Sequence, residues 1–186
     1  MAGVSSYRSI VRWRASDVET LADIVQPGLT VLFVGLNPSP VSVAKGHYHQ
    51  GRLGQQFWRL LVEHRILPNP AHGQFHDDLL LANRFGITDI VKVPSARADN
   101  LDPADVDYGR VVLRKKIDDL KPRIVCSVYK KALEKLLETK FKNQWGLVDE
   151  RIGNSLIFIL PFPYKSAEDI SLHMRQLSTL LGRSGR

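Results

Sequence analysis

An asparagine stands in a tight turn directly after the most compact apolar run of the chain. Residues 30–35 read TVLFVG, and Asn37 follows within the turn Gly-Leu-Asn-Pro-Ser-Pro at 35–40. A buried strand that delivers a polar side chain onto a turn is a common way for an α/β protein to present a reactive group. The sequence therefore predicts that Asn37 carries the chemistry of this protein.

Other kinds of reactive centre are weakly supported. His47 and His49 lie in the loop after this turn, but no third ligand accompanies them, and such pairs are more often ordinary loop residues than a metal site. The glycine spacing of a nucleotide-binding loop is missing, and no serine sits in the glycine-flanked turn of a Ser-His-Asp hydrolase. Cys126, the single cysteine, lies in an apolar run and is more typical of a buried small hydrophobe than of a nucleophile. We therefore expect no metal, no cofactor and no iron–sulfur cluster.

Short apolar runs alternate with amphipathic segments along the chain. The predicted strands are 30–35, 87–91, 123–128 and 155–160. The predicted helices are 17–25, 55–64, 76–83, one that Asp102-Pro103 opens and Pro122 ends, 130–138, and a last one capped by Ser166 with Asp169. This alternation implies right-handed crossovers. The fold class is therefore α/β, a three-layer α/β/α sandwich with a four-stranded parallel sheet.

Length and composition indicate one globular domain. The 186 residues contain no repeat or linker, so we take 1–186 as a single domain with a basic arm at 1–16 and a loose tail at 183–186. A hydrophobic content of 44% excludes wholesale disorder. No apolar run approaches the ~18 residues that span a bilayer, and the N-terminus lacks the apolar core of a secretory signal. We expect an intracellular monomer that does not bind membranes.

The charge of the chain favours a polyanionic partner such as nucleic acid. The net charge is +7 and the pI is about 9.7. Residues 110–131 alone hold eight basic and two acidic side chains. Part of that run is equally well explained as the solvated face of a helix.

Polar side chains follow each predicted strand. The exits carry Asn37, Lys92, Tyr129-Lys130 and the segment 161–165, which reads PFPYK. Ligands of open parallel sheets bind beyond the carboxyl ends of the strands, so these residues should lie along one edge. An amide, aromatic rings and cations suit nucleic-acid bases and phosphates.

The segment GLNPSPVSVAKGHYHQGRLGQQFW at 35–58 resembles the first motif of the mismatch-specific uracil/thymine-DNA glycosylases, in the uracil-DNA glycosylase superfamily. That motif reads Gly-Ile-Asn-Pro-Gly and, after a loop, Phe-Trp. Further similar segments follow the family's order, namely 21–26, FGITDIV at 85–91, KPRIV at 121–125, 144–146 and Leu160-Pro161. The resemblance covers roughly residues 20–182.

The resemblance implies a monofunctional DNA glycosylase of base excision repair that removes uracil, or thymine and other deaminated bases, from mismatched duplex DNA such as a G:U pair. Asn37 takes the place of the asparagine that positions the hydrolytic water. An amide is no strong base, but it can orient water against C1′ while the glycosidic bond breaks into an oxocarbenium-like state. Base flipping costs least at mispaired or damaged bases, which favours such substrates.

The resemblance also assigns a base pocket and a DNA-contacting surface. Tyr48 or His49 lies where the family stacks an aromatic ring on the flipped base, and an extra residue in the loop leaves both open. The implied base-pocket residues are Gly35, Leu36, Ser39, Ser42, Tyr48, His49 and Gln55, with backbone N–H groups around Leu36 and Ser39 facing the departing base. The implied DNA contacts are Lys45, His47, Phe162, Tyr164 and Lys165.

Two departures from the family pattern leave the substrate open. Ser39 replaces a glycine, and Phe162-Pro163-Tyr164-Lys165 replaces the usual Asn-Pro-Ser-Gly or serine-rich loop that fills the gap in the DNA. Phe162 or Tyr164 would be the wedge, although Phe162 is equally well explained as a core residue. The alternatives are therefore a glycosylase for hypoxanthine or another damaged base, and a non-catalytic nucleic-acid-binding module of the same fold. A lysine-based bifunctional glycosylase has less support.

Overall fold

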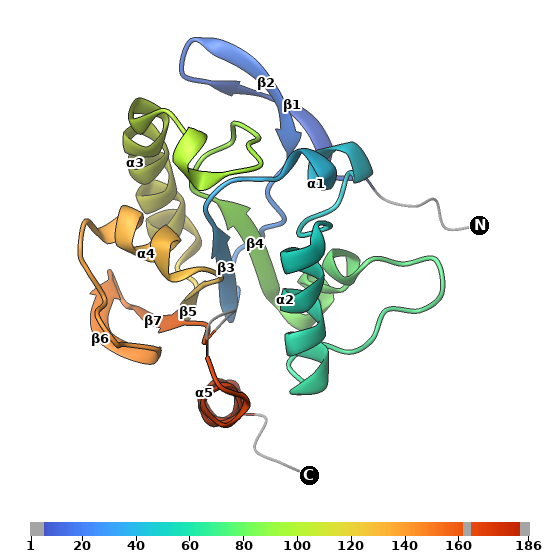
Figure 1. Ribbon diagram of the computed structural model, residues 1–186, viewed down its shortest axis with the longest axis vertical. Coiled ribbons are helices and arrows are strands. Elements are labelled where there is room, and N and C mark those ends of the chain that lie inside the picture. Colours follow the sequence, from blue (N-terminus) through green and yellow to red (C-terminus); the bar gives the residue numbers. More distant parts are fainter. Residues whose placement is uncertain (1–5, 162–164, 183–186) are drawn as a thin grey trace.

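The computed structural model describes residues 6–161 and 165–182. Its centre is a five-stranded sheet in the order β4-β3-β5-β7-β6 (Figure 1). The strands are β3 (Val31–Gly35), β4 (Phe85–Asp89), β5 (Ile124–Ser127), β6 (Gly146–Ile152) and β7 (Ser155–Ile159). All four predicted strands are present and mutually parallel, which confirms the α/β sheet. The unpredicted strand β6 pairs antiparallel with β7 at one edge.

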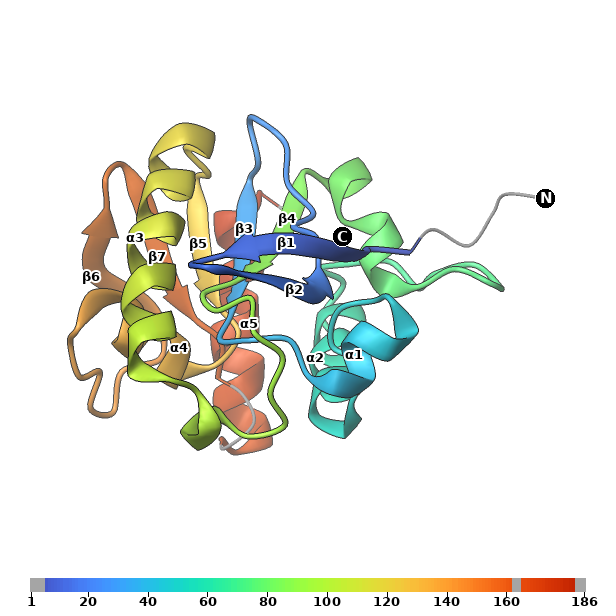
Figure 2. The ribbon, with the colours of Figure 1, turned by 90° about the horizontal axis from the view of Figure 1, so that it is seen from above.

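Helices cover both faces of this sheet, which confirms the three-layer architecture (Figures 1 and 2). They are α2 (Arg52–Glu63) and α5 (Ala167–Leu180) on one face, and α3 (Pro103–Leu120) and α4 (Lys130–Leu137) on the other. Alternate residues of β3 serve the two faces. Val31 and Phe33 pack with the α2 and α5 side chains, and Leu32 and Val34 pack with those of α3 and α4. A strand buried on both faces reads as a continuous apolar run, which is the pattern of TVLFVG.

The described part of the N-terminal region, from residue 6, is an ordered hairpin, so the predicted helix at 17–25 is wrong. Strands β1 (Arg8–Trp13) and β2 (Ser16–Leu21) pair antiparallel. The hairpin lies beyond the carboxyl ends of β3 and β4, near α1 (Pro40–Lys45) (Figure 1). Trp13 fastens it to α3, because Nε1 donates to Asp105 Oδ1 at 3.0 Å.

Short helices flank the two strands that form the site, with α1 after β3 and two 3₁₀ turns before β4. Helix α1 was not predicted; it begins after Ser39, whose Oγ accepts the Ser42 N–H at 3.2 Å, and it ends at Gly46 in the left-handed conformation. The predicted helix 76–83 is instead a pair of 3₁₀ turns, η1 (His76–Leu79) and η2 (Leu81–Asn83). A third turn, η3 (Ala98–Asn100), precedes α3.

Both predicted helix caps are confirmed. Asp102 accepts the Ala104 N–H at 2.9 Å with Pro103 in the first turn of α3. Ser166 accepts the Asp169 N–H at 3.2 Å at the start of α5. Among the described helices, none is long and apolar enough to cross a membrane.

Candidate active site

Asn37 follows β3, and its side chain is held by two backbone carbonyls. Nδ2 donates to the oxygens of Pro38 at 3.0 Å and Ser95 at 2.9 Å. Only the NH₂ end of an amide can satisfy two carbonyl acceptors, so these contacts fix which way the amide points. No described residue donates a hydrogen bond to Oδ1. That oxygen is therefore available to accept a hydrogen bond from water or a ligand.

A cavity of about 330 Å³, called here the base pocket, opens beside Asn37 at the carboxyl edge of the sheet. Its walls come from the β3 exit, α1, the loop before α2, the end of β4, residues 95–98 and Tyr129 after β5. The structure brings together five of the residues assigned to the site from sequence, which are Asn37, Ser39, Ser42, Tyr48 and His49. The convergence predicted for the strand exits is thus found for Asn37 after β3 and Tyr129 after β5, whereas Lys92 after β4 does not line the pocket.

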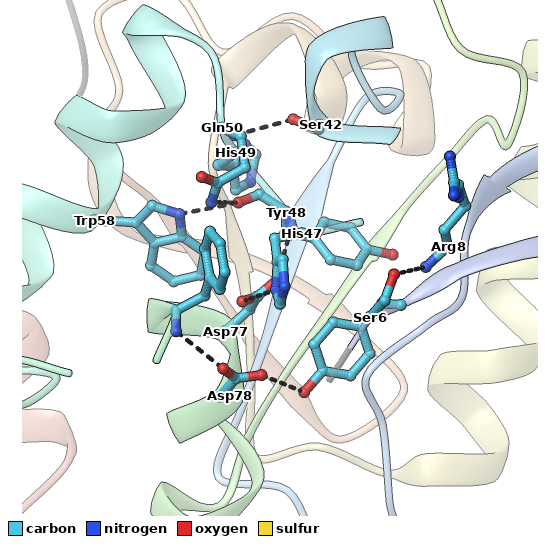
Figure 3. A network of polar contacts seen from close by, with 12 residues as sticks. Ser6, Arg8, Ser42, His47, Tyr48, His49, Gln50, Trp58, Asp77 and Asp78 are labelled. Carbon is cyan, nitrogen blue, oxygen red and sulfur yellow. Dashed lines mark hydrogen bonds and ion pairs between the residues drawn. The ribbon is translucent and has the colours of Figure 1, made fainter. Parts of the chain in front are cut away.

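Two serines brace the near wall of the base pocket. The hydroxyls of Ser39 and Ser42 lie 2.9 Å apart. Ser42 Oγ also accepts the Gln50 N–H at 3.0 Å (Figure 3). Ser39, which stands where the family has glycine, therefore turns its hydroxyl back toward α1. These contacts join α1 to the loop that carries Tyr48 and His49.

A buried carboxylate behind the pocket anchors that loop. Asp77 Oδ1 lies 2.9 Å from His47 Nδ1, and Oδ2 accepts the Tyr48 N–H at 2.7 Å (Figure 3). His47 is 1% exposed and stacks on Phe75 with ring centroids 3.6 Å apart. The assignment of His47 as a DNA contact does not fit this burial, and the side chain acts as a structural anchor.

His47, Asp77 and Asp78 also form a cluster whose potential metal-ligand atoms lie within 4.8 Å of one another. Protein groups already use its carboxylate oxygens. Asp78 Oδ1 accepts the Tyr7 hydroxyl at 3.2 Å, and Oδ2 accepts the Phe75 N–H at 2.9 Å (Figure 3). The cluster therefore joins the N-terminal segment, the loop and η1 in one hydrogen-bonded unit.

Tyr48 and His49 both line the base pocket, so the structure leaves both as candidates for the stacking ring. Tyr48 is 1% exposed, and its hydroxyl donates to the Ala22 carbonyl at 3.2 Å. His49 Nε2 is buried without a hydrogen-bond partner among the described residues. Burial lowers the pKa of His49 to about 4, so its ring is neutral near pH 7.

Asp89, the last residue of β4, was not identified from the sequence, yet it lines the base pocket. It is 3% exposed, and no described residue donates a hydrogen bond to its Oδ2. Burial raises the pKa of Asp89 to about 7, against the opposing effect of Lys92. Its carboxyl group therefore exchanges a proton readily at neutral pH.

Glycines make room for these two pocket groups. A Cβ on Gly35, which pairs with Asp89 across β3 and β4, would lie 2.1 Å from Asp89 Oδ1. A Cβ on Gly54 would lie 2.4 Å from the His49 carbonyl oxygen. Gly35, assigned to the base pocket from the sequence, thus contributes space for a carboxylate and does not itself line the cavity.

Three other assigned residues lie behind or beside the pocket. Gln55 does not line it; Nε2 donates to the His49 carbonyl at 3.3 Å and to Gln50 Oε1 at 3.2 Å. Leu36 is 7% exposed and lines a neighbouring cavity. Lys92, expected at the ligand edge, is 6% exposed and faces inward, where Nζ meets Asp23 Oδ1 at 2.5 Å. Nothing in the sequence around Lys92 indicated that its side chain would face inward.

The remaining residues that the sequence assigned to DNA contact do not line the base pocket or lie outside the described residues. Lys45 is exposed in the last turn of α1, and its role stays a prediction. Lys165 lies 3.7 Å from the carboxylate of Asp169, with its side chain 30% exposed. Phe162 and Tyr164 lie outside the described residues.

Comparison with known families places the whole site in one superfamily. A family model described as the uracil DNA glycosylase superfamily matches residues 22–169. The chain belongs to the uracil DNA glycosylase superfamily. Its members' general activity is that of a DNA glycosylase, a hydrolase of DNA repair. The match spans Asn37, Tyr48, His49 and Asp89, so the base pocket of this glycosylase lies within the shared domain.

Proposed function

We propose that this glycosylase is monofunctional and hydrolyses the N-glycosidic bond of uracil, and of thymine or other deaminated bases, in mismatched duplex DNA. The observation that carries the proposal is the placement of the Asn37 amide at the wall of the base pocket. Its Nδ2 is anchored by two backbone carbonyls, and no described residue donates a hydrogen bond to its Oδ1. An amide oxygen held in this way accepts a hydrogen bond from water and orients it without competing for its proton.

The proton of that water needs an acceptor, and Asp89 supplies one. As the C1′–N bond breaks, its electron pair leaves with the base, and the sugar becomes oxocarbenium-like. Water held by Asn37 adds to C1′ and passes its proton to the Asp89 carboxylate. A pKa of about 7 suits this role, because the group must be ionised before the step and must hold the proton after it.

His49 faces the departing base in this scheme. Its ring is neutral near pH 7 because burial lowers its pKa, and Nε2 has no described protein partner. A neutral imidazole that carries its proton on Nε2 donates a hydrogen bond to a base that leaves with negative charge. The buried Asp77 anchor fixes the backbone that holds His49 in place.

The first test measures base release from a U:G duplex by alkali cleavage of the abasic product. We expect Asn37→Ala to lose release almost completely while binding to the duplex stays within about threefold. Asn154→Ala, in the turn between β6 and β7, is the matched control and should keep full activity. Unchanged turnover in Asn37→Ala would remove Asn37 from the mechanism.

Hypoxanthine is the second candidate substrate. Hypoxanthine and uracil both present a ring N–H beside a carbonyl oxygen, so a hydrogen-bond donor on His49 Nε2 suits either base. A panel of uracil, thymine and hypoxanthine opposite each base ranks the candidates by rate. A panel without any abasic product, together with steeply salt-dependent binding, would support the non-catalytic alternative instead.

A further inference from the structure

A second cavity of about 180 Å³, called here the rear cavity, lies on the other side of Asp89 from the base pocket. Among the described residues, Asp89 alone lines both cavities. The remaining walls of the rear cavity come from β1, from Asp23, from the segment after β4 and from α3. The carboxyl group of Asp89 therefore separates the space for the base from a second set of charged side chains.

Two lysines share one carboxylate in the rear cavity. Asp23 Oδ1 lies 2.5 Å from Lys92 Nζ, and Asp23 Oδ2 pairs with Lys116 Nζ. Lys92 follows β4 and Lys116 belongs to α3, and their side chains are 7% and 21% exposed. The Thr88 hydroxyl also donates to Asp23 Oδ1 at 2.5 Å. The two ammonium groups therefore exceed the carboxylate that they share by one positive charge.

The ammonium group of Lys92 is fixed in place and has no N–H left for a ligand. Besides its contact with Asp23, Nζ donates to the Leu21 carbonyl at 3.1 Å and to the Tyr48 hydroxyl at 3.2 Å. These three contacts use the three donors of an ammonium group. Because Tyr48 lines the base pocket, the positive charge of Lys92 stands directly behind a pocket wall. What Lys92 offers to the site is therefore its charge.

Asp89 is the group that balances this charge. Together with Asp23 it supplies the two acidic side chains in the described lining of the rear cavity, so an ionised Asp89 brings two cations against two anions. In decreasing order of effect, burial raises the pKa of Asp89, Lys92 lowers it, Asp23 raises it and Lys116 lowers it. The lysines therefore oppose the effect of burial on Asp89.

Other titratable groups line the two cavities as well. They are Tyr48, His49, Arg52 and Tyr129 in the base pocket, and Arg12 and Tyr108 in the rear cavity. Burial lowers the pKa of His49 to about 4 and raises the pKa of Tyr48, so both rings are neutral near pH 7. Arg12 and Arg52 are exposed, and water screens their charges. Lys92 and Lys116 are therefore the cations that act on Asp89 from a shielded position.

We propose that Lys92 and Lys116 are positioning residues of the reaction, which keep Asp89 ionised after DNA has covered the base pocket. Bound DNA excludes water from that side of Asp89 and adds negative phosphates nearby, and both changes favour the neutral acid, which cannot accept a proton. The two lysines act from the rear cavity, which the bound base does not occupy. The inference rests on the proposed function, since it takes Asp89 as the acceptor of the water's proton.

The first measurement does not depend on turnover. Infrared difference spectra, taken in each background with and without Asp89→Asn, isolate the C=O band of protonated Asp89, and a pH series gives its pKa. Lys92→Met should raise that pKa by about one, and Lys116→Met should raise it by less. Asp23→Asn should lower it, because the two lysines then act on Asp89 without their shared anion.

The direction of the change separates a loss of charge from damage to the fold. A variant that merely admits water to Asp89 lowers its pKa toward the ordinary 3.8, whereas loss of a lysine charge raises it. Lys92→Arg keeps the charge and should restore the original pKa. Lys115→Met is the matched control, because this neighbour on α3 is exposed and pairs with Asp119, and it should leave the pKa of Asp89 unchanged.

The second measurement is the pH-rate profile of base release from a U:G duplex. In Lys92→Met, release should fall about tenfold on the rising limb and stay unchanged on the plateau, as a pKa raised by about one requires. An unchanged or lowered pKa of Asp89 in both lysine variants would overturn the inference and leave the glycosylase assignment intact. The expected pKa changes without base release from any lesion would overturn the proposed function alone. Lys116 is partly exposed, so its variant keeps the test valid if Lys92→Met fails to fold.

Discussion

Asp77 and Asp89 are buried carboxylates on two sides of the loop that holds Tyr48 and His49. At Asp77, one oxygen meets the His47 ring and the other accepts a backbone N–H. At Asp89, no described residue donates to Oδ2, and the side chain lines the base pocket. Exposure does not distinguish them, because Asp77 is 1% exposed and Asp89 is 3% exposed.

The difference lies in what each carboxylate does for the folded chain. A buried carboxylate whose hydrogen bonds are complete holds structure, and removing it disturbs what it held. A buried carboxylate without donors lowers stability, and such groups cluster at functional sites. We therefore assign Asp77 to the architecture of the loop and Asp89 to the chemistry, and the following experiments test that division.

The largest expected effect is on catalysis by Asp89→Asn. An amide cannot take the proton of the attacking water, so base release should fall by about 10²–10⁴-fold. In the unmodified enzyme the rate should rise with pH and level off above about 7, as Asp89 becomes ionised. The rising limb should disappear in the variant. A pH-rate profile on a U:G duplex measures both the loss of rate and the pH dependence. If the rate of the variant still rises with pH, the titrating group is not Asp89.

The second expected effect is on the pH dependence of stability, again through Asp89. Its pKa is raised from an ordinary 3.8 to about 7, so the folded state binds the proton more tightly than the unfolded state. The resulting stabilisation is complete below pH 3.8 and is lost as the pH rises toward 7, a change of a few kcal/mol. Urea unfolding at several pH values should show a flatter curve for Asp89→Asn. Identical curves would contradict the raised pKa.

Asp77→Asn should show the reverse pattern. It should lower the free energy of unfolding by more than it raises the barrier to base release. Asparagine keeps one acceptor oxygen and places an NH₂ group against a former donor, which costs about 1–3 kcal/mol. For a chain of this length that lowers Tm by about 2–4 °C per kcal/mol. Exposed Asp149→Asn on β6 should change stability by less than about 0.5 kcal/mol. If Asp77→Asn abolished base release at unchanged stability, the division between the two aspartates would be wrong.

Gln55→Ala should have the smallest effect, because its two hydrogen bonds only brace the loop. We expect a loss of about 0.5–1.5 kcal/mol and a change in base release of less than about threefold. Hydrogen exchange of the backbone amides at 48–50 should accelerate, since the His49 carbonyl and Gln50 lose their partner. The adjacent Gln56→Ala is the matched control and should leave that exchange unchanged. A tenfold loss of activity in Gln55→Ala would instead place Gln55 in the pocket.

The fold was predictable where burial produces a continuous apolar run. The four parallel strands read that way because helices cover both of their faces, and two helix starts carry Ser or Asp caps. The β1–β2 hairpin was missed because Val18, Leu21 and Val25 also fit a helical period. Strand β6 was missed because it is an edge strand whose charged residues, Asp149 to Arg151, interrupt the apolar pattern.

The candidate site was predictable where a motif carries it and not where packing does. Asn37, Ser39, Ser42, Tyr48 and His49 fall in one segment, and all of them line the pocket. Asp89 was missed because the predicted strand ran to Val91, which placed the aspartate inside a strand. Its place at the strand end, beside Gly35 in the adjacent strand, was the signal that could have identified it. His47 and Gln55 resemble ligand-binding residues in the sequence, and only their partners in space identify them as supports.

The bridge between Ile24 and Ile87 has a consequence for how copies of this protein behave toward one another. Ile24 and Ile87 exchange both backbone hydrogen bonds, at 3.1 and 2.9 Å, along the outer side of β4. A Cβ on Gly86 would lie 2.8 Å from the Ile24 carbonyl oxygen, so this close approach depends on glycine. An exposed row of backbone donors and acceptors on an edge strand invites strand addition and aggregation. Because Ile24 takes up the backbone hydrogen-bonding groups of Ile87, the segment after the hairpin leaves fewer free donors and acceptors on this edge for pairing with another copy.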